Sequence, residues 1–213
     1  MCFHSKQTKS ALELENRFKA KIENPTEFKS QEHINGFDFP KTPIITDENP
    51  EVITHFNWGL IPSWSKDVDI RKYTLNAKIE TLDEKPSFKN SVNKRCLVIS
   101  NGFFEWQWQD SKGKNKHKYE IGIKNDELFA FAGIYSEWIN QVTGEIVNSY
   151  SIVTTEANTL MAEIHNTKKR MPIILKAEDE TKWLNHVPYK DFAFPYQIEL
   201  SAKQIGNNLN LFF

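Results

Sequence analysis

Residues 95–109 read RCLVISNGFFEWQWQ, and this stretch decides the fold. It is rich in aliphatic, β-branched and aromatic side chains, which favours a strand that packs into a core. In an extended chain, Phe103 and Glu105 fall on one face, and Phe104 and Trp106 fall on the other. A carboxyl held against aromatic groups has a raised pKa, which brings it toward the range useful for proton transfer. The alternative is an acid on the solvated face of an edge strand.

Outward from this stretch, turn signals separate further strands, and helices are predicted at the flanks. Ser10 is the candidate N-cap of the first helix, which is amphipathic. The predicted strands are 95–109, 116–124, 128–135, 146–154 and 172–175, and the predicted helices are 10–23, 157–164 and 178–184. Residues 36–57 contain three prolines and are predicted to form irregular connections and short strands. Antiparallel strands flanked by helices predict an α+β fold, organised as a single domain over residues 1–213.

The composition narrows the functional classes. With 27 Lys+Arg against 28 Asp+Glu, the formal net charge is −1, which excludes a globally basic nucleic-acid binder but allows a local basic groove. Two cysteines cannot build a disulfide framework, so we expect a reducing, cytoplasmic location. A Cys2–Cys96 bridge stays open, although Cys96 falls in a predicted buried strand. No segment reaches transmembrane length, so no membrane association is expected. The chain lacks CxxC, HExxH, G-x-S-x-G and P-loop motifs, and neither a metal nor a cofactor is expected.

Cys2 directly follows the initiator Met1, and its small side chain makes removal of Met1 plausible. Cys2 would then carry an α-amine and a thiol, with ordinary pKa values of roughly 7.7–8.0 and about 8.5. A modest environmental shift would supply neutral amine and thiolate together. The amine can form a Schiff base with an aldehyde, and the thiol can close on it to give a thiazolidine. The alternative is a small residue at a frayed terminus.

Three other clusters could carry chemistry, and each has a structural alternative. Residues 58–64 (WGLIPSW) form an aromatic and proline segment that either packs or offers a stacking face for a base. If residues 76–80 (NAKIE) are extended, Asn76, Lys78 and Glu80 share one face suited to a sugar-phosphate; helix capping is the alternative. His165 precedes three cations and suits contact with a phosphate, unless it is a structural histidine. These cations are Lys168, Lys169 and Arg170.

In sequence order, these segments resemble the SOS-response-associated peptidase family, whose module is called the SRAP domain. The resemblance runs from residue 2 to about residue 207, and its motifs are Cys2, WGLIPSW (58–64), LNAKIET (75–81), RCLVISNGFFEW (95–106), IHNTKKRMPIIL (164–175) and Ile205-Gly206-Asn207. It implies a single α+β domain of curved antiparallel sheets with a barrel-like core and short flanking helices. It also implies a monomer that binds single-stranded DNA during the DNA damage response. The processed Cys2 would trap the aldehyde of an abasic site in a stable thiazolidine, a suicide-type, lyase-like crosslinking reaction.

The resemblance also assigns roles to residues of this chain. Asn76 would hold the abasic sugar and orient the Cys2 amine, Glu105 would move protons, and His165 would act as acid or base on the sugar oxygen. The residues expected along the DNA path are Lys78, Arg170, Trp64, Lys168 and Lys169.

Three departures from the family pattern stand out. Phe3-His4 replaces the usual Gly-Arg, and Lys78 replaces an Arg, which keeps the charge but loses the bidentate fork. Four residues also separate His165 from Arg170, more than we expect in this family.

Two other functional classes remain open at this point. One is a thiol peptidase that acts on itself or on other proteins, with Cys2 and His165 as nucleophile and base. The other is a non-catalytic module that binds single strands.

Overall fold

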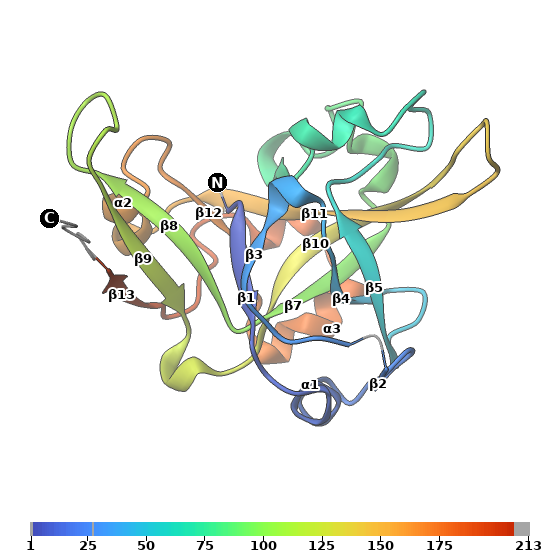
Figure 1. Cartoon of the computed structure of the whole chain (residues 1–213), viewed down its shortest axis with the longest axis horizontal. Coiled ribbons are helices and arrows are strands. Elements are labelled where there is room, and N and C mark those ends of the chain that lie inside the picture. The colour runs from blue at the N-terminus through green and yellow to red at the C-terminus, as the bar shows by residue number, and fades with distance from the viewer. Residues whose placement is uncertain (1, 27, 207–213) are drawn as a thin grey trace, which may run out of the picture.

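A computed structural model describes residues 2–26 and 28–206, which form two β-sheets with short helices around them (Figure 1). The first sheet has the order β13-β9-β8-β1-β3. Its strands are β1 (His4–Gln7), β3 (Gln31–Asn35), β8 (Gly102–Trp108), β9 (Lys116–Gly122) and β13 (Ser201–Ile205).

The second sheet follows the order β12-β11-β10-β7-β4-β5-β2 and closes on itself. Closure comes from a parallel pairing of β11 with β5, in which Tyr150 lies opposite Trp58. The strands from β11 through β10, β7 and β4 to β5 therefore form a five-stranded barrel, which confirms the expected α+β fold with a barrel-like core. The strands of this sheet are β2 (Lys21–Ile22), β4 (Lys41–Thr46), β5 (Val52–Trp58), β6 (Asn76–Lys78, paired with β11), β7 (Arg95–Ser100), β10 (Phe129–Ile139), β11 (Ile146–Glu156) and β12 (Arg170–Pro172).

The helices are short and lie outside the sheets (Figure 1). The α-helices are α1 (Ala11–Phe18), α2 (Thr159–Ile164) and α3 (Glu180–Leu184). The 3₁₀ turns are Gly36–Asp38, Asp69–Tyr73, Ile79–Thr81, Lys89–Ser91, Lys124–Asp126, Ala177–Asp179 and Tyr189–Phe192. No helix in the described part of the chain is long and apolar enough to cross a membrane.

Several predicted elements needed correction. The helix predicted over 10–23 begins where expected, with a Ser10–Glu13 capping box, but it ends early because Lys19 adopts a left-handed conformation (φ 55°). Residues 36–57 contain short strands, as predicted, but β4 and β5 are regular strands of the barrel, so less of this stretch is irregular than expected. The strand predicted over 172–175 instead spans Arg170–Pro172, and beyond it Ile174 makes an isolated bridge to Phe131.

The decisive stretch 95–109 is not one strand but two, β7 in the barrel and β8 in the five-stranded sheet. The chain changes sheets at Asn101, which is buried and whose side-chain amide forms hydrogen bonds through both its oxygen and its nitrogen. Its Oδ1 accepts from the Thr8 backbone at 3.0 Å, and its Nδ2 donates to Thr8 Oγ1 and Asp126 Oδ1, each at 2.8 Å. Lys6 pairs with Glu120 and Asp126 in the same network. This network fixes the end of β1 beside the point where the chain passes from β7 to β8.

One hydrophobic cluster packs beneath the N-terminus. It contains Cys2, Trp58, Phe103 and Tyr150, all essentially without exposed surface. Cys2 and Cys96 are both free thiols, so the alternative of a bridge between them is not realised.

Candidate active site

The N-terminal segment is fixed through its backbone on both sides of Phe3. The Cys2 carbonyl accepts a hydrogen bond of 2.8 Å from Asn76 Nδ2. The Phe3 carbonyl accepts one of 2.8 Å from the Gly36 backbone N–H. A Cβ at Gly36 would lie 3.2 Å from that carbonyl oxygen and 3.2 Å from Trp58 Cε3, so a glycine permits this close approach. β1 then pairs with β8, with His4 opposite Phe104. Cys2 is therefore held at a defined place rather than at a frayed end.

Asn76 offers a further polar atom beside Cys2. It begins β6, which runs parallel to β11 with Asn76 opposite Ile152. While its Nδ2 donates to Cys2, its Oδ1 is buried and accepts no hydrogen bond from the described residues. A buried acceptor without a partner is costly, and it can be satisfied by a ligand that donates a hydrogen bond.

Glu105 lies in β8, which is flanked by β1 and β9 and is therefore not an edge strand. Its exposed fraction is 5%, and Phe103 on the same face is fully buried, as the alternation predicts. Burial raises the Glu105 pKa to about 7, within the range useful for proton transfer.

The protonation state of the Cys2 thiol differs from the thiolate that the sequence analysis expected. Burial, followed by the negative charge of Glu105, raises the pKa of the Cys2 thiol well above its ordinary value. The Sγ donates a weak hydrogen bond of 3.7 Å to the His4 carbonyl. In this environment Cys2 is held as a neutral thiol, and the effect of Glu105 on its pKa means that the two residues lie within electrostatic reach.

His165 reaches the site from the end of α2, where it is the C-cap. Its Nδ1 lies 2.9 Å from the Arg170 carbonyl oxygen and 3.3 Å from the Arg170 backbone nitrogen. Burial lowers the His165 pKa to about 4, so the imidazole is neutral at physiological pH. The adjoining Asn166 fastens the helix to β8, with its Nδ2 donating to the Trp108 carbonyl at 2.9 Å and its Oδ1 accepting from the Trp108 N–H at 3.2 Å.

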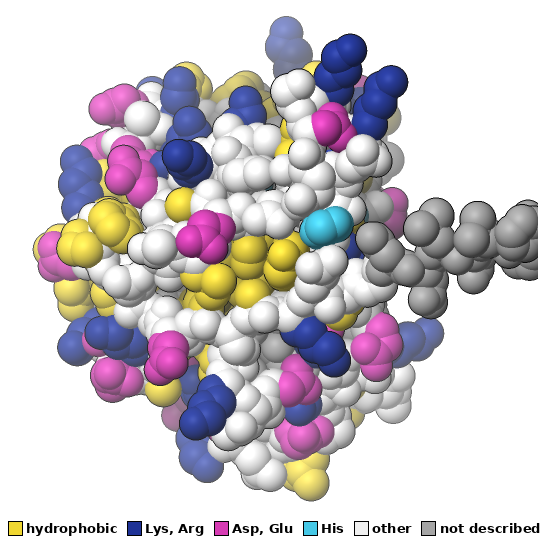
Figure 2. All heavy atoms as spheres, turned by 90° about the vertical axis from the view of Figure 1, so that its left-hand side faces the viewer, with side chains coloured by type: hydrophobic (Ala, Val, Ile, Leu, Met, Phe, Trp, Pro, Cys, Tyr) yellow, Lys and Arg dark blue, Asp and Glu magenta, His cyan; other side chains and the backbone are white. Residues whose placement is uncertain are grey.

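These elements bring the four predicted catalytic residues around one cluster. Met161 and Ile164 of α2 belong to the same hydrophobic cluster as Cys2 and Phe103. Figure 2 views the face at the left of Figure 1, where β8, β9 and α2 lie. That face is hollowed at its centre, with hydrophobic side chains in the hollow and charged side chains around it (Figure 2).

The predicted DNA-contacting cations have different surroundings. Lys78, Lys168 and Lys169 are exposed. Arg170 is instead largely buried, and its guanidinium donates to both carboxylate oxygens of Glu80 at 2.8 and 2.9 Å. The same guanidinium donates to the Thr154 carbonyl at 2.8 Å. A phosphate at Arg170 would therefore share it with Glu80.

Two sequence interpretations are refined here. The condition for a face shared by Asn76, Lys78 and Glu80 is met only as far as Lys78, because the chain leaves β6 there and turns through a 3₁₀ segment that contains Glu80. In WGLIPSW, Trp58 is core and donates from Nε1 to the Leu75 carbonyl at 2.9 Å. Trp64 is 50% exposed and donates to the Pro86 carbonyl at 3.1 Å, so it stays a candidate for stacking.

Sequence reasoning missed Gly36 and Lys85. Gly36 lies in the stretch expected to be irregular, and nothing in its neighbours in the chain indicates that it meets Phe3. Lys85 lies beside Pro86 in a polar segment typical of a surface turn, yet it lines a pocket together with Asn76.

The chain is similar to known proteins in sequence and in fold. A sequence model described as SOS response associated peptidase (SRAP) matches residues 1–210. The chain is 43% identical over 143 residues to the Abasic site processing protein YoqW of Bacillus subtilis, in an alignment that covers 67% of this chain and 61% of that protein. It is 34% identical over 167 residues to the Abasic site processing protein HMCES of Xenopus tropicalis, covering 68% of this chain and 49% of that protein. The chain thus spans less than two thirds of the length of these relatives. A crystal structure of a Bacteroides thetaiotaomicron protein superposes with a TM-score of 0.87 at 38% identity, covering 97% of this chain and 93% of that one.

Proposed function

Because the chain belongs to the SOS response associated peptidase family, we propose that it processes abasic sites in DNA by capturing them covalently at Cys2. The names of its relatives support the substrate, since both YoqW and HMCES are called abasic site processing proteins. The observation that carries the proposal is the placement of Cys2, fixed by Asn76 and within electrostatic reach of a carboxyl whose pKa is about 7. Capture requires prior removal of Met1, which lies outside the described residues.

The proposed reaction joins an aldehyde, an amine and a thiol with loss of one water. The α-amine of Cys2 attacks the aldehyde carbon of the ring-opened abasic sugar and gives a carbinolamine. Protonated Glu105 donates to the departing hydroxyl, water leaves, and an imine forms. The Cys2 sulfur then bonds to the imine carbon while the thiol proton passes to nitrogen, which closes the thiazolidine. A buried neutral thiol suits this order, because the amine attacks first and the thiol second.

The surrounding residues would orient the sugar and handle its proton transfers. Asn76 Oδ1, buried and without a partner in the described chain, would accept from the abasic sugar or from the Cys2 amine. Neutral His165 would exchange a proton with the sugar oxygen as the ring opens. Lys78, Lys168, Lys169 and Arg170 would contact phosphates of a single strand, and Trp64 would lie along its path.

The thiol peptidase alternative is less well supported by the site. A cysteine nucleophile acts as the thiolate, and burial of Cys2 opposes that form.

The test begins with an intact-mass measurement that establishes loss of Met1. Incubation with a single-stranded oligonucleotide carrying one abasic site should then give an adduct that survives denaturation. Cys2→Ala keeps the α-amine but lacks the thiol, so its imine should be trapped only by borohydride, whereas Cys96→Ala should form the stable adduct normally. A stable adduct in Cys2→Ala without borohydride would exclude the thiazolidine. Cleavage of an unrelated peptide in the absence of DNA would favour the peptidase.

A further inference from the structure

A pocket of about 590 Å³ opens beside the fixed N-terminal segment. Asn76, which donates to the Cys2 carbonyl, is part of its wall, so the pocket adjoins the proposed capture site. A volume of several hundred Å³ is typical of pockets that hold a small organic ligand. Its lining residues are Phe3, Lys72, Tyr73, Leu75, Asn76, Lys78, Thr81, Lys85, Pro86, Ser87 and Phe88.

The lining combines flat apolar surface with positive charge. Phe3 and Tyr73 supply aromatic rings, and the Tyr73 side chain is 83% exposed. Lys78 and Lys85 form no salt bridge with any acid in the described chain, whereas Lys72 is paired with Asp69 at 3.2 Å. No Asp or Glu of the described residues lines the pocket. Aromatic surface with unpaired ammonium groups is the chemistry that receives a base and its phosphates.

Phe3 forms part of the wall of this pocket. Its carbonyl is held by Gly36 and the preceding carbonyl by Asn76. Its ring packs on the ring of Phe37, with centroids 4.9 Å apart. Phe3 therefore presents a positioned aromatic ring one residue from Cys2, so stacking on it requires little further ordering of the backbone.

We propose that this pocket holds the intact nucleotide next to the abasic residue, with its base stacked on Phe3 and its phosphates beside Lys78 and Lys85. The inference rests on the proposed function and adds a specificity to it: the protein reads whether a base is present on one flank of the lesion. Phe3 acts here as a specificity-determining residue, and the chemistry at Cys2 does not depend on it.

The experiment separates binding from capture by using Cys2→Ala protein and a tetrahydrofuran analogue of the abasic site. Fluorescence anisotropy gives Kd for three oligonucleotides. The first has a base on each side of the analogue, the second lacks the base on its 5′ side, and the third lacks the base on its 3′ side. Loss of one particular flanking base should weaken binding roughly 5- to 30-fold, which is about 1–2 kcal/mol, the scale of one base–aromatic stack. Loss of the other flanking base should have a smaller effect.

Addition of Phe3→Ala should remove this dependence on the flanking base. Phe194→Ala, which removes an exposed ring outside the pocket, should leave it intact. Lys85→Gln should weaken binding of all three oligonucleotides, while Lys203→Gln on β13 should not.

Two results would overturn the inference: equal affinity for all three oligonucleotides before Phe3 is changed, or an undiminished dependence after Phe3→Ala. Failure of the covalent reaction is a separate result. The affinity could depend on the flanking base, and lose that dependence with Phe3→Ala, while the processed protein forms no adduct at Cys2. This pair of results would support the nucleotide pocket and reject the capture chemistry.

Discussion

At the scale of single residues, burial of Glu105 has a cost to the fold and underlies its proposed role in the site. In an unfolded chain its carboxyl loses a proton near 4.5, but in the fold it does so at about 7. Between these values the folded state binds more protons than the unfolded state, so this residue lowers the stability as pH rises from 4.5 through 7. Above pH 7 the full cost of the buried charge is present.

Glu105→Gln should therefore stabilise the protein at pH 8 by about 3 kcal/mol and change its stability little at pH 5. The physical reason is that glutamine resembles the protonated carboxyl and never carries the buried charge. Urea unfolding at the two pH values measures the difference. An equal effect at pH 5 and pH 8 would contradict the raised pKa. In the crosslinking assay, the same variant should be slower and should lose the inflection of rate near pH 7.

Residues of the site differ in how far the sequence reveals them. Burial of Glu105 could be predicted only as one of two alternatives, because Phe103 shares its face but the same alternation also fits an acid on the solvated face of an edge strand. The pairing of Arg170 with Glu80 could not be predicted, because 90 positions separate the two residues. The direction of the Cys2 pKa also depends on the cluster formed by distant strands, so the expectation of an accessible thiolate failed.

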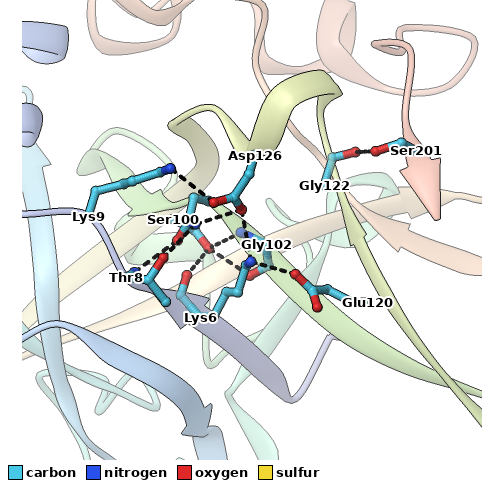
Figure 3. A network of polar contacts seen from close by, with 10 residues as sticks. Lys6, Thr8, Lys9, Ser100, Gly102, Glu120, Gly122, Asp126 and Ser201 are labelled. Atoms are coloured by element: carbon cyan, nitrogen blue, oxygen red, sulfur yellow. Dashed lines mark hydrogen bonds and ion pairs between the residues drawn. The ribbon is translucent and has the colours of Figure 1, made fainter. Parts of the chain in front are cut away.

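At the scale of elements, the change of sheet between β7 and β8 depends on polar contacts that local sequence does not encode. Lys6 of β1, which is mostly buried, lies between Glu120 of β9 and Asp126 (Figure 3). The strands predicted within 95–109 do form, before and after Asn101. The transfer of the chain from one sheet to the other depends on the hydrogen bonds of Asn101, which join it to Thr8 and Asp126. The short strands expected in 36–57 were predicted without bounds for a related reason, since their places in the barrel depend on distant partners. Their prolines suggest breaks, yet Pro43 is accommodated within β4 opposite His55.

Lys6→Ala should lower the free energy of unfolding by about 2 kcal/mol, because two partly buried carboxylates lose their shared cation. Denaturant unfolding followed by tryptophan fluorescence measures the loss. Lys41→Ala, at an exposed position of β4 without a salt bridge to a described acid, should change it by less than about 0.5 kcal/mol. Similar effects from both substitutions would mean that the network contributes nothing specific.

At the scale of the whole molecule, the site exists because remote strands meet. The barrel closes through β5 and β11, and this closure places Trp58 and Tyr150 in the cluster beneath Cys2. The sequence pattern predicts strands and the α+β class, but a parallel pairing across more than 90 positions is decided by packing of the complete chain. The single domain and the monomeric state stay predictions.

The proposed binding of DNA also belongs to this scale, because the net charge of −1 gives the molecule no general attraction for a polyanion. Affinity for single strands must come from local cations, and each phosphate contact contributes about 0.7 to the slope of log K against log salt concentration.

In Cys2→Ala protein, Lys78→Gln and Lys168→Gln should each reduce that slope by about 0.7, with weaker binding at low salt. Lys203→Gln is the matched control, since it removes one positive charge from an exposed position that is not among the residues expected along the DNA path. Anisotropy titrations between 50 mM and 200 mM salt would measure the slopes. If all three variants reduced the slope equally, binding would reflect overall charge, and the assigned path past Lys78 and Lys168 would be wrong.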